Sequence, residues 1–270
     1  MISYDWQQRL KKDVKDFVEN KIPARDYDFE IIYNVYPERQ NGDIPQEVIT
    51  FVAKEIGKKI IRDPEQYMDF LRYIHENKGG AGKHIFNIIM QKIVRRYPGE
   101  YDKLLIELIE NMEDESEIKK IFDTIIYHLL KKYPGEYVDA LVDWIRKTPS
   151  DAVLKNIFRV LRNFIRRNKN MAYQILERCE SLWNIDNSSV RKGNALLLRT
   201  LYGIDKDYYR EVYEEFQNTH NPNFVEILAY AVSEDSEVVR NSIERWEKSG
   251  NVRIKKAASQ ARKNLSKLRK

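Results

Sequence analysis

The sequence predicts an all-α fold, namely a right-handed α-solenoid of stacked antiparallel helix pairs. YPGEYDKLLIELIE begins at Tyr97, and YPGEYVDALVDWIRK begins 36 residues later at Tyr133. A second pair of similar segments, KKIFDTIIYHLLKK from Lys119 and KNIFRVLRNFIRRN from Lys155, follows at the same spacing. Self-similarity at a period of roughly 20 to 50 residues is typical of stacked repeats. No useful stretch alternates apolar and polar residues, so we expect no sheet.

The N-terminal part is predicted to be a capping helix followed by an atypical helix pair. Apolar residues recur at helical spacing between Trp6 and Val18, and Pro23 then ends the pattern, which places the capping helix within residues 1–24. Residues 27–36 and 44–61 are expected to form the first pair, joined by the turn-forming segment PERQNGDIP. Helix-pair repeats are expected over residues 25–233, and C-terminal capping helices over residues 234–270.

One tyrosine marks the phase of the repeat on the first helix of each pair. It recurs at spacings of 34, 36, 36 and 36 residues, at Tyr67, Tyr101, Tyr137, Tyr173 and Tyr209. Three of these helices are expected to begin near a proline, because a first helical turn leaves its N–H groups without intrahelical partners anyway. The three prolines are Pro64, Pro98 and Pro134.

The second helix of each pair is predicted to bury an apolar face against its own first helix and against the next repeat. The clearest apolar ladder has the i, i+3, i+4, i+7, i+11 spacing of one helix face and consists of Leu154, Ile157, Phe158, Leu161 and Ile165. After Tyr209 the spacing loosens into three shorter helical segments, over residues 222–232, 236–248 and 252–269.

Composition favours one continuous domain over residues 1–270. The chain has only 10 Gly and 8 Pro and no linker rich in them, which suits an uninterrupted array of helices. The single Cys179 cannot form an intrachain disulfide, and the first residues lack the apolar core of a signal peptide, so we expect a cytoplasmic protein. No apolar run approaches the ~18 residues that a membrane helix needs.

The net charge of +5 is concentrated at the C-terminus. Residues 251–270 contain eight Lys or Arg and no acid, so the other 250 residues carry a net charge of −3. The basic isoelectric point is therefore a property of the last helix, and it does not make the whole array basic. Alanines at Ala257, Ala258 and Ala261 predict a close-packing side for that helix, which favours a cap with a basic exterior.

Two segments resemble a known family of helical repeats. DSEVVRNSIERW from Asp235 and SSVRKGNALLLRTL from Ser188 resemble the HEAT-like branch of the armadillo-type repeats, in which an acid at the turn precedes Val-Arg. Tetratricopeptide repeats, with their period of about 34 residues, are the rival, but they need small residues where helices cross, and here most of those positions are bulky or charged. A weaker resemblance to the HEAT-like DNA alkylation repair glycosylases implies duplex binding in a concave groove. No residue matches well enough to be carried over from that family.

No motif assigns catalysis, a metal or a cofactor. NKGGAGKH from Asn77 lacks the first Gly, the Ser or Thr and the preceding strand of a phosphate loop, so we expect a turn between two helices. The four histidines never fall three or four residues from one another or from Cys179, which disfavours a zinc site. The sequence therefore favours a non-catalytic role.

Basic residues recur in one position of the second helices and are the candidate partner-binding residues. The column consists of Lys83, Lys119, Lys155 and Arg191, and a stripe on one helix adds Arg159, Arg162 and Arg166 to Lys155. Such a row suits a phosphate backbone or an acidic peptide. The alternative is a solvated face whose cations pair with acids, such as Lys119 with Asp123. Basic pairs at the ends of these helices, such as Arg166 and Arg167, compensate the helix dipole.

These observations support two hypotheses of function. The first is a non-catalytic scaffold that binds a macromolecular partner, a protein, along the concave surface of the second helices, as helical arrays commonly do. The second is a nucleic-acid-binding protein that uses the basic groove. Neither hypothesis involves a membrane.

Overall fold

The computed structural model describes residues 14–17, 19, 46–77 and 79–268. Most of the capping helix predicted within residues 1–24, the helix predicted over residues 27–36 and the PERQNGDIP turn lie outside the described residues; residues 14–17 are helical. Every regular element in the described part of the chain is a helix, which confirms the all-α prediction. Across those same residues, no helix combines the length and apolar character that crossing a membrane requires.

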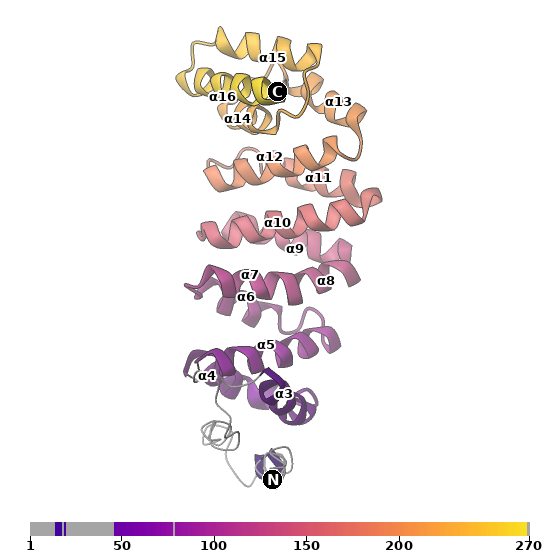
Figure 1. Ribbon diagram of the computed structural model, residues 1–270, viewed down its shortest axis with the longest axis vertical. Coiled ribbons are helices and arrows are strands. Elements are labelled where there is room, and N and C mark those ends of the chain that lie inside the picture. The colour runs from indigo at the N-terminus through magenta and orange to yellow at the C-terminus, as the bar shows by residue number, and fades with distance from the viewer. Residues whose placement is uncertain (1–13, 18, 20–45, 78, 269–270) are drawn as a thin grey trace, which may run out of the picture. The chain divides into compact units, whose positions relative to one another are not determined.

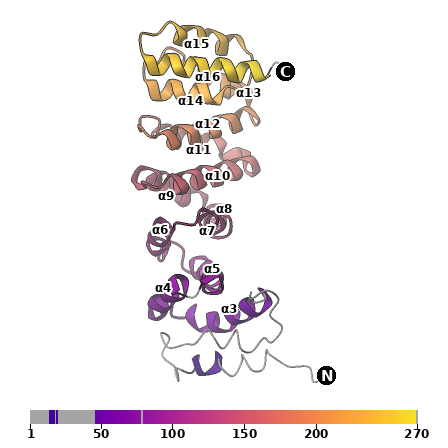
Figure 2. The same cartoon turned by 60° about the vertical axis from the view of Figure 1, so that its left-hand side comes forward.

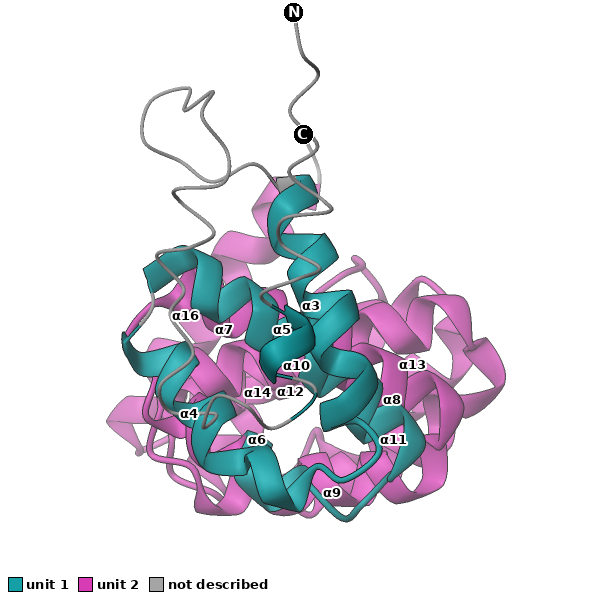
Figure 3. Ribbon diagram, turned by 90° about the horizontal axis from the view of Figure 1, so that it is seen from below, with its two compact units in different colours: residues 1–105 teal, residues 106–270 magenta. Residues whose placement is uncertain are grey.

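The chain divides into two compact units, residues 1–105 and residues 106–270, which Figure 3 colours separately. We call them the N-terminal unit and the C-terminal unit. In the N-terminal unit, α3 and α4 both pack against α5. These helices are α3 (Gln46–Ile60), α4 (Met68–Asn77) and α5 (Gly79–Arg96), and a 3₁₀ turn (Glu65–Tyr67) precedes α4. The boundary falls inside α6 (Asp102–Glu110).

The C-terminal unit is a succession of helix pairs. Its helices are α7 (Glu115–Ile121), a π-helical segment (Phe122–Ile126) and α8 (Tyr127–Lys132), which run on without a break, then α9 (Pro134–Lys147), α10 (Asp151–Arg167), α11 (Ala172–Glu180), α12 (Ser188–Tyr202), α13 (Lys206–Phe216), α14 (Pro222–Ala231), α15 (Glu237–Glu247) and α16 (Val252–Leu268). Alternate helices pack on one another, α10 on α12, α12 on α14 and α14 on α16 (Figures 1 and 2). Each also contacts the helix that precedes it in the chain.

The apolar ladder of α10 shows why this helix forms where the sequence predicts it. Ser150 caps the helix, because its Oγ accepts a hydrogen bond of 3.3 Å from the N–H of Val153. The five predicted ladder residues, Leu154, Ile157, Phe158, Leu161 and Ile165, are each no more than 1% exposed. Burial of this stripe against α7, α8, α9 and α12 therefore supplies the hydrophobic stabilisation of the helix.

The two copies of YPGEY differ in structure, which corrects one predicted helix start. The second copy begins α9 at Pro134, as expected, but after Pro98 the chain makes a turn with Gly99 at φ +84° and α6 begins only at Asp102. The residue after each YPGEY explains the difference. Val138 is fully buried, so continuing the helix through it buries apolar surface, whereas Asp102 is favoured in a first helical turn by the positive end of the helix dipole.

The residues around these two prolines nevertheless make matching local contacts. The Arg96 guanidinium lies 5.5 Å from the centre of the Tyr97 ring, and the Lys132 ammonium lies 5.0 Å from the centre of the Tyr133 ring. A cation over an aromatic face is attracted by the ring quadrupole. Equivalent positions of the two YPGEY copies therefore form the same contact, although their backbones differ.

The turn between α4 and α5, in the glycine-rich segment after Asn77, is shorter than expected. Gly79 has φ +54°, a left-handed conformation that favours glycine, and α5 begins at this residue. Gly80, Ala81 and Gly82 lie in the first turns of α5, where Ala81 and Gly82 are buried. The predicted turn between two helices is therefore only partly right, because residues 79–84 of NKGGAGKH belong to α5.

The last helix has the predicted close-packing side. Ala257, Ala258 and Ala261 are at most 5% exposed, and α16 packs on α14 and α15. Asn264 joins this side by donating a hydrogen bond of 3.2 Å to the carbonyl oxygen of Ala229. The exposed lysines of α16, including Lys256 and Lys263, lie on its other side.

Candidate binding groove

The predicted basic residues fall into three environments. Lys83 is half-buried in α5 of the N-terminal unit, and the others belong to the C-terminal unit. Within that unit, Lys155, Arg159 and Arg191 form ion pairs with carboxylates, and Lys119 is exposed on α7. Arg162 and Arg166 lie at the C-terminal end of α10, where they line a hollow. The predicted column is therefore not a uniform row of available cations.

Two of the predicted residues pair with acids of α7 and of the π-helical segment that follows it. The Lys155 ammonium is 3.6 Å from Oε2 of Glu115, and Nη1 of Arg159 donates a hydrogen bond of 2.6 Å to Oδ1 of Asp123. Arg159 is also held by Asn156, whose Oδ1 accepts from its Nε and Nη2. The sequence suggested that Asp123 pairs with Lys119, but in the structure its partner is Arg159, 36 residues away. The charge of Arg159 is thus largely compensated within the chain.

Arg191 belongs to a neutral network that joins three helices. Its Nη1 lies 2.7 Å from Oδ1 of Asp186 and its Nε lies 2.5 Å from Oε2 of Glu226 on α14. Arg253 of α16 donates to the other oxygen of Glu226 at 3.0 Å and to Oδ1 of Asn223 at 2.8 Å. Two arginines and two carboxylates balance one another here, and the Arg191 side chain is only 12% exposed. This network holds helices together and leaves Arg191 no free charge for a partner.

Four cations surround a hollow of about 350 Å³ between the C-terminal ends of α10 and α12, which we call the cationic hollow. They are Arg162, Arg166, Lys169 and Arg199, and the remaining lining residues are Leu196, Thr200, Gly203 and Ile204. No carboxylate lines it. Arg162 hydrogen-bonds to the neutral amide oxygen of Asn163, at 3.3 Å and 3.0 Å, which orients the guanidinium without neutralising it.

The four charges exceed what the helix ends require. Each helix C-terminus carries roughly −0.5 of an elementary charge, so the ends of α10 and α12 together supply about −1. Against this stand four positive side chains, and within residues 106–268 none of them forms an ion pair with a carboxylate. Dipole compensation therefore accounts for about one of the charges, and the hollow retains a positive potential that an anion would relieve.

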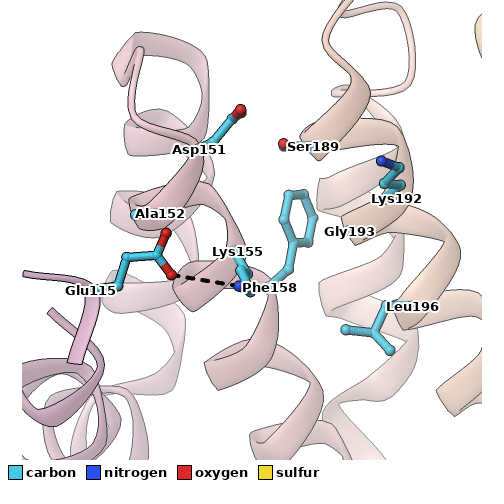
Figure 4. A pocket seen from close by; sticks show the side chains of 9 residues that line it. All are labelled: Glu115, Asp151, Ala152, Lys155, Phe158, Ser189, Lys192, Gly193 and Leu196. Carbon is cyan, nitrogen blue, oxygen red and sulfur yellow. Dashed lines mark ion pairs between the residues drawn. The ribbon is translucent and has the colours of Figure 1, made fainter.

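A second hollow of about 380 Å³ lies between the N-terminal halves of α10 and α12, and we call it the apolar hollow. Figure 4 shows the Phe158 ring reaching from α10 toward α12, with Leu196 and Gly193 on the facing helix. Glu115, Asp151, Lys155 and Lys192 stand around its rim. Its charges are mixed, and its interior is formed by aromatic and aliphatic atoms.

Gly193 brings the two helices together at this point. A Cβ atom placed on Gly193 would lie 2.0 Å from Cδ2 of Phe158, so only glycine allows α12 to approach the ring this closely. Phe158 is 1% exposed and is held by the core of the unit. The shape of the apolar hollow therefore depends on this contact.

Leu196 lines both hollows, so they form one feature, the α10–α12 groove. One end is apolar with a mixed rim, and the other end is purely cationic. Ligand sites commonly combine an apolar surface with a few convergent charged groups, which fix the orientation of what binds. The groove can hold an extended segment that carries both an apolar side chain and negative charge.

The sequence did not predict two of the four cations. Lys169 lies in the 3₁₀ turn (Lys169–Met171) after α10, and Arg199 lies in the last turn of α12. Neither stands 36 residues from a predicted cation, so a search along the repeat misses them. The available signal is that Arg199 follows Lys192 by seven residues and so shares its helix face.

The histidines and the cysteine that the structure describes form no metal site. Among the described residues, no group of three or more His, Cys, Asp or Glu could hold a metal ion. His75 is buried and packs edge-on against Phe86, with ring centres 4.8 Å apart. Burial raises the pKa of the Cys179 thiol to about 12, which keeps it protonated and unreactive at neutral pH.

Comparisons of the chain with protein-family models, with curated proteins and with solved structures found no match.

Proposed function

We propose that this chain is a HEAT-like repeat scaffold, a right-handed α-solenoid of helix pairs, that binds a protein partner without acting on it chemically. The binding surface is the α10–α12 groove, and the partner contributes an acidic segment that also carries an apolar side chain. The observation that carries the proposal is the meeting, at Leu196, of an apolar hollow and a cationic hollow without any carboxylate.

The repeat character is supported by contacts that recur along the chain. In the C-terminal unit α10, α12, α14 and α16 each pack on the helix that precedes them in the chain, and α10, α12 and α14 also pack on the next even-numbered helix. The cation over the tyrosine ring occurs at Tyr97 and again at Tyr133. Stacked repeats bury a continuous core through such neighbour contacts and expose a long binding surface.

A protein partner fits the groove better than a nucleic acid does. A phosphate backbone needs cations along its whole path, but Glu115 and Asp151 stand at the apolar end of the groove. Arg159 and Arg191, which would extend the row, are compensated by Asp123, Asp186 and Glu226. A peptide of mixed character meets each end of the groove with complementary chemistry.

The test is selection from a multivalent displayed library of random peptides against the full-length chain. We expect enrichment of peptides that combine Asp or Glu with Leu, Ile, Phe or Met. The variant Arg166→Glu/Arg199→Glu should lose these peptides, because it reverses two of the four charges of the cationic hollow. The matched control Lys256→Glu/Lys263→Glu makes the same change in net charge on α16, at exposed residues that line neither hollow, and should retain them.

A nucleic acid is the competing outcome. Duplex DNA should be titrated in parallel at two salt concentrations, since each contacted phosphate adds a slope of about −0.9 to the dependence of log affinity on log salt. Tight DNA binding with a steep slope, together with no enriched peptide, would overturn the scaffold proposal. If the selected peptides bind the Arg166→Glu/Arg199→Glu variant as well as they bind the wild type, the α10–α12 groove is not the binding surface.

A further inference from the structure

We propose that the cationic hollow recognises a phosphate monoester, so that the partner segment is a phosphorylated peptide. This inference rests on the proposed function and adds that phosphorylation of the partner regulates its binding to the same groove. The phosphate of a phosphoserine or phosphothreonine would lie among Arg162, Arg166, Lys169 and Arg199, and a nearby apolar side chain would enter the apolar hollow.

The composition of the hollow matches the chemistry of this group. A phosphomonoester carries a charge of about −1.5 to −2 at neutral pH and three strong acceptor oxygens. Three arginines present planar donor forks that can bind phosphate oxygens in pairs, and Lys169 adds a point charge. Clusters of arginine are the general means by which domains recognise phosphorylated motifs.

The amount of charge distinguishes a phosphate from a carboxylate. Four cations against about −1 from two helix ends leave a surplus of about +3 in the hollow. A single carboxylate compensates about one of these charges, whereas a phosphate dianion compensates about two. Arg162, held in place by Asn163, loses little conformational freedom when it binds.

The spacing of the two hollows sets the spacing of the motif. Along α12, the apolar hollow is lined between Ser189 and Leu196, and the cationic hollow between Leu196 and Ile204. Their midpoints are about seven or eight residues apart, or ~11 Å at 1.5 Å per helical residue. An extended peptide covers this distance in about three residues. We therefore place the apolar side chain about three positions from the phosphorylated residue.

The hollow also has a suitable size and position. Its volume of about 350 Å³ is at the lower end of ligand sites, which matches one phosphorylated side chain rather than a long polyanion. A nucleic acid strand leaving it toward α7 would meet Glu115 and Asp151. The negative charge of the same two carboxylates is compatible with a neutral or basic peptide residue at that end.

The experiment uses the full-length chain and two synthetic peptide libraries. One library has a fixed phosphoserine with random residues at five positions on each side, and the other has serine in its place. We expect the phosphoserine library to be retained at least tenfold more strongly at 150 mM salt. Apolar residues should be enriched about three positions from the phosphoserine. The variant Arg166→Gln/Arg199→Gln should abolish this preference, and Lys256→Gln/Lys263→Gln should preserve it.

Controls separate the phosphopeptide from other anions. A phosphorylated and an unphosphorylated copy of one enriched peptide are compared by calorimetry with inorganic phosphate and with a single-stranded oligonucleotide carrying a 5′-phosphate. Inorganic phosphate binding as tightly as the peptide, or the oligonucleotide binding more tightly, would assign the hollow to a free anion or to nucleic acid. Thermal unfolding checks the variants; since neutralising Arg166 and Arg199 removes like-charge repulsion, their melting temperatures should not fall.

The two experiments distinguish a failure of the phosphate inference from a failure of the proposed function. Equal retention of the two libraries overturns the phosphate site alone, provided that displayed acidic peptides still require Arg166 and Arg199. Absence of binding in both experiments overturns the scaffold proposal as well.

Discussion

Substitution of Gly193 by alanine tests whether close approach of α12 to Phe158 holds the groove together. Gly193 lies inside α12, where alanine is ordinarily better than glycine by about 1 kcal/mol because it restricts the unfolded chain and exposes less backbone. The added Cβ would lie 2.0, 2.2 and 2.4 Å from three atoms of the Phe158 ring. The local propensity and the packing therefore predict opposite signs.

The packing effect is the larger one. Ordinary carbon contacts are about 3.5 to 4.0 Å, so the ring or the helix must move by more than 1 Å. Phe158 is 1% exposed and has little space to move, which puts the cost of overpacking near the upper end of its usual range, about 3 kcal/mol. After the propensity gain, we expect Gly193→Ala to lower the free energy of unfolding by about 2 kcal/mol, or the melting temperature by about 4 to 8 °C.

Equilibrium urea unfolding of the full-length chain measures this change. Gly135→Ala is the matched control, because a Cβ at Gly135 in the first turn of α9 would have no atom within 4 Å, and its stability should be unchanged or slightly higher. Phe158→Leu should lose less stability in the Gly193→Ala background than in the wild type, since the smaller side chain makes room for the methyl group. A Gly193→Ala chain as stable as the wild type would refute the close approach of the two helices.

The remaining predictions concern pH and dimensions. Burial raises the pKa of Cys179 from 9.0 to about 12 and that of Tyr209 from 10.0 to about 12, so each group keeps its proton longer in the folded chain than in the unfolded chain. The contribution of these two groups to the free energy of unfolding is fully present below about pH 9. It is lost as the pH rises toward 12, by up to ~1.4 kcal/mol per pH unit for each group. Urea midpoints at pH 8, 9.5 and 10.5 measure this loss, and a midpoint that stays constant to pH 10.5 would contradict it. A solenoid also predicts a radius of gyration clearly above the ~18 Å of a compact 270-residue chain; small-angle scattering near 18 Å would contradict that architecture.

Helix positions were predictable from the sequence where the spacing of apolar residues agreed with capping residues and prolines at the helix ends. The segments predicted over residues 222–232, 236–248 and 252–269 correspond to α14, α15 and α16 within a residue or two. Pro222 starts α14 behind an Asn221 cap, and Asn251 accepts from the N–H of Arg253 at the start of α16. The two YPGEY copies mark the limit of such local signals. Their different starts depend on whether the following residue, Val138 or Asp102, is buried by the surrounding chain.

The candidate site was less predictable, because it depends on which charges meet across helices. The 36-residue period predicted equivalent helix positions for Lys155 and Arg191, but it carries no information about Glu115 or Glu226, which pair with them. Arg162 and Arg166 were predicted, and their surroundings were not. Lys169 and Arg199 join them only because the ends of α10 and α12 lie side by side, which spacing along one helix cannot show.

The network around Arg191 has a consequence for how the C-terminal unit unfolds. In a stack of helix pairs, each pair can fray from the end unless its interface with the next is strong, and cooperativity is set by those interfaces. Glu226 binds Arg191 of α12 with one oxygen and Arg253 of α16 with the other. Detaching α16 therefore removes Arg253, which binds both Glu226 and Asn223, and weakens the packing of α14 on α12. The last helix thus protects the α10–α12 groove from a distance, and the three helices should exchange their amide protons as one unit.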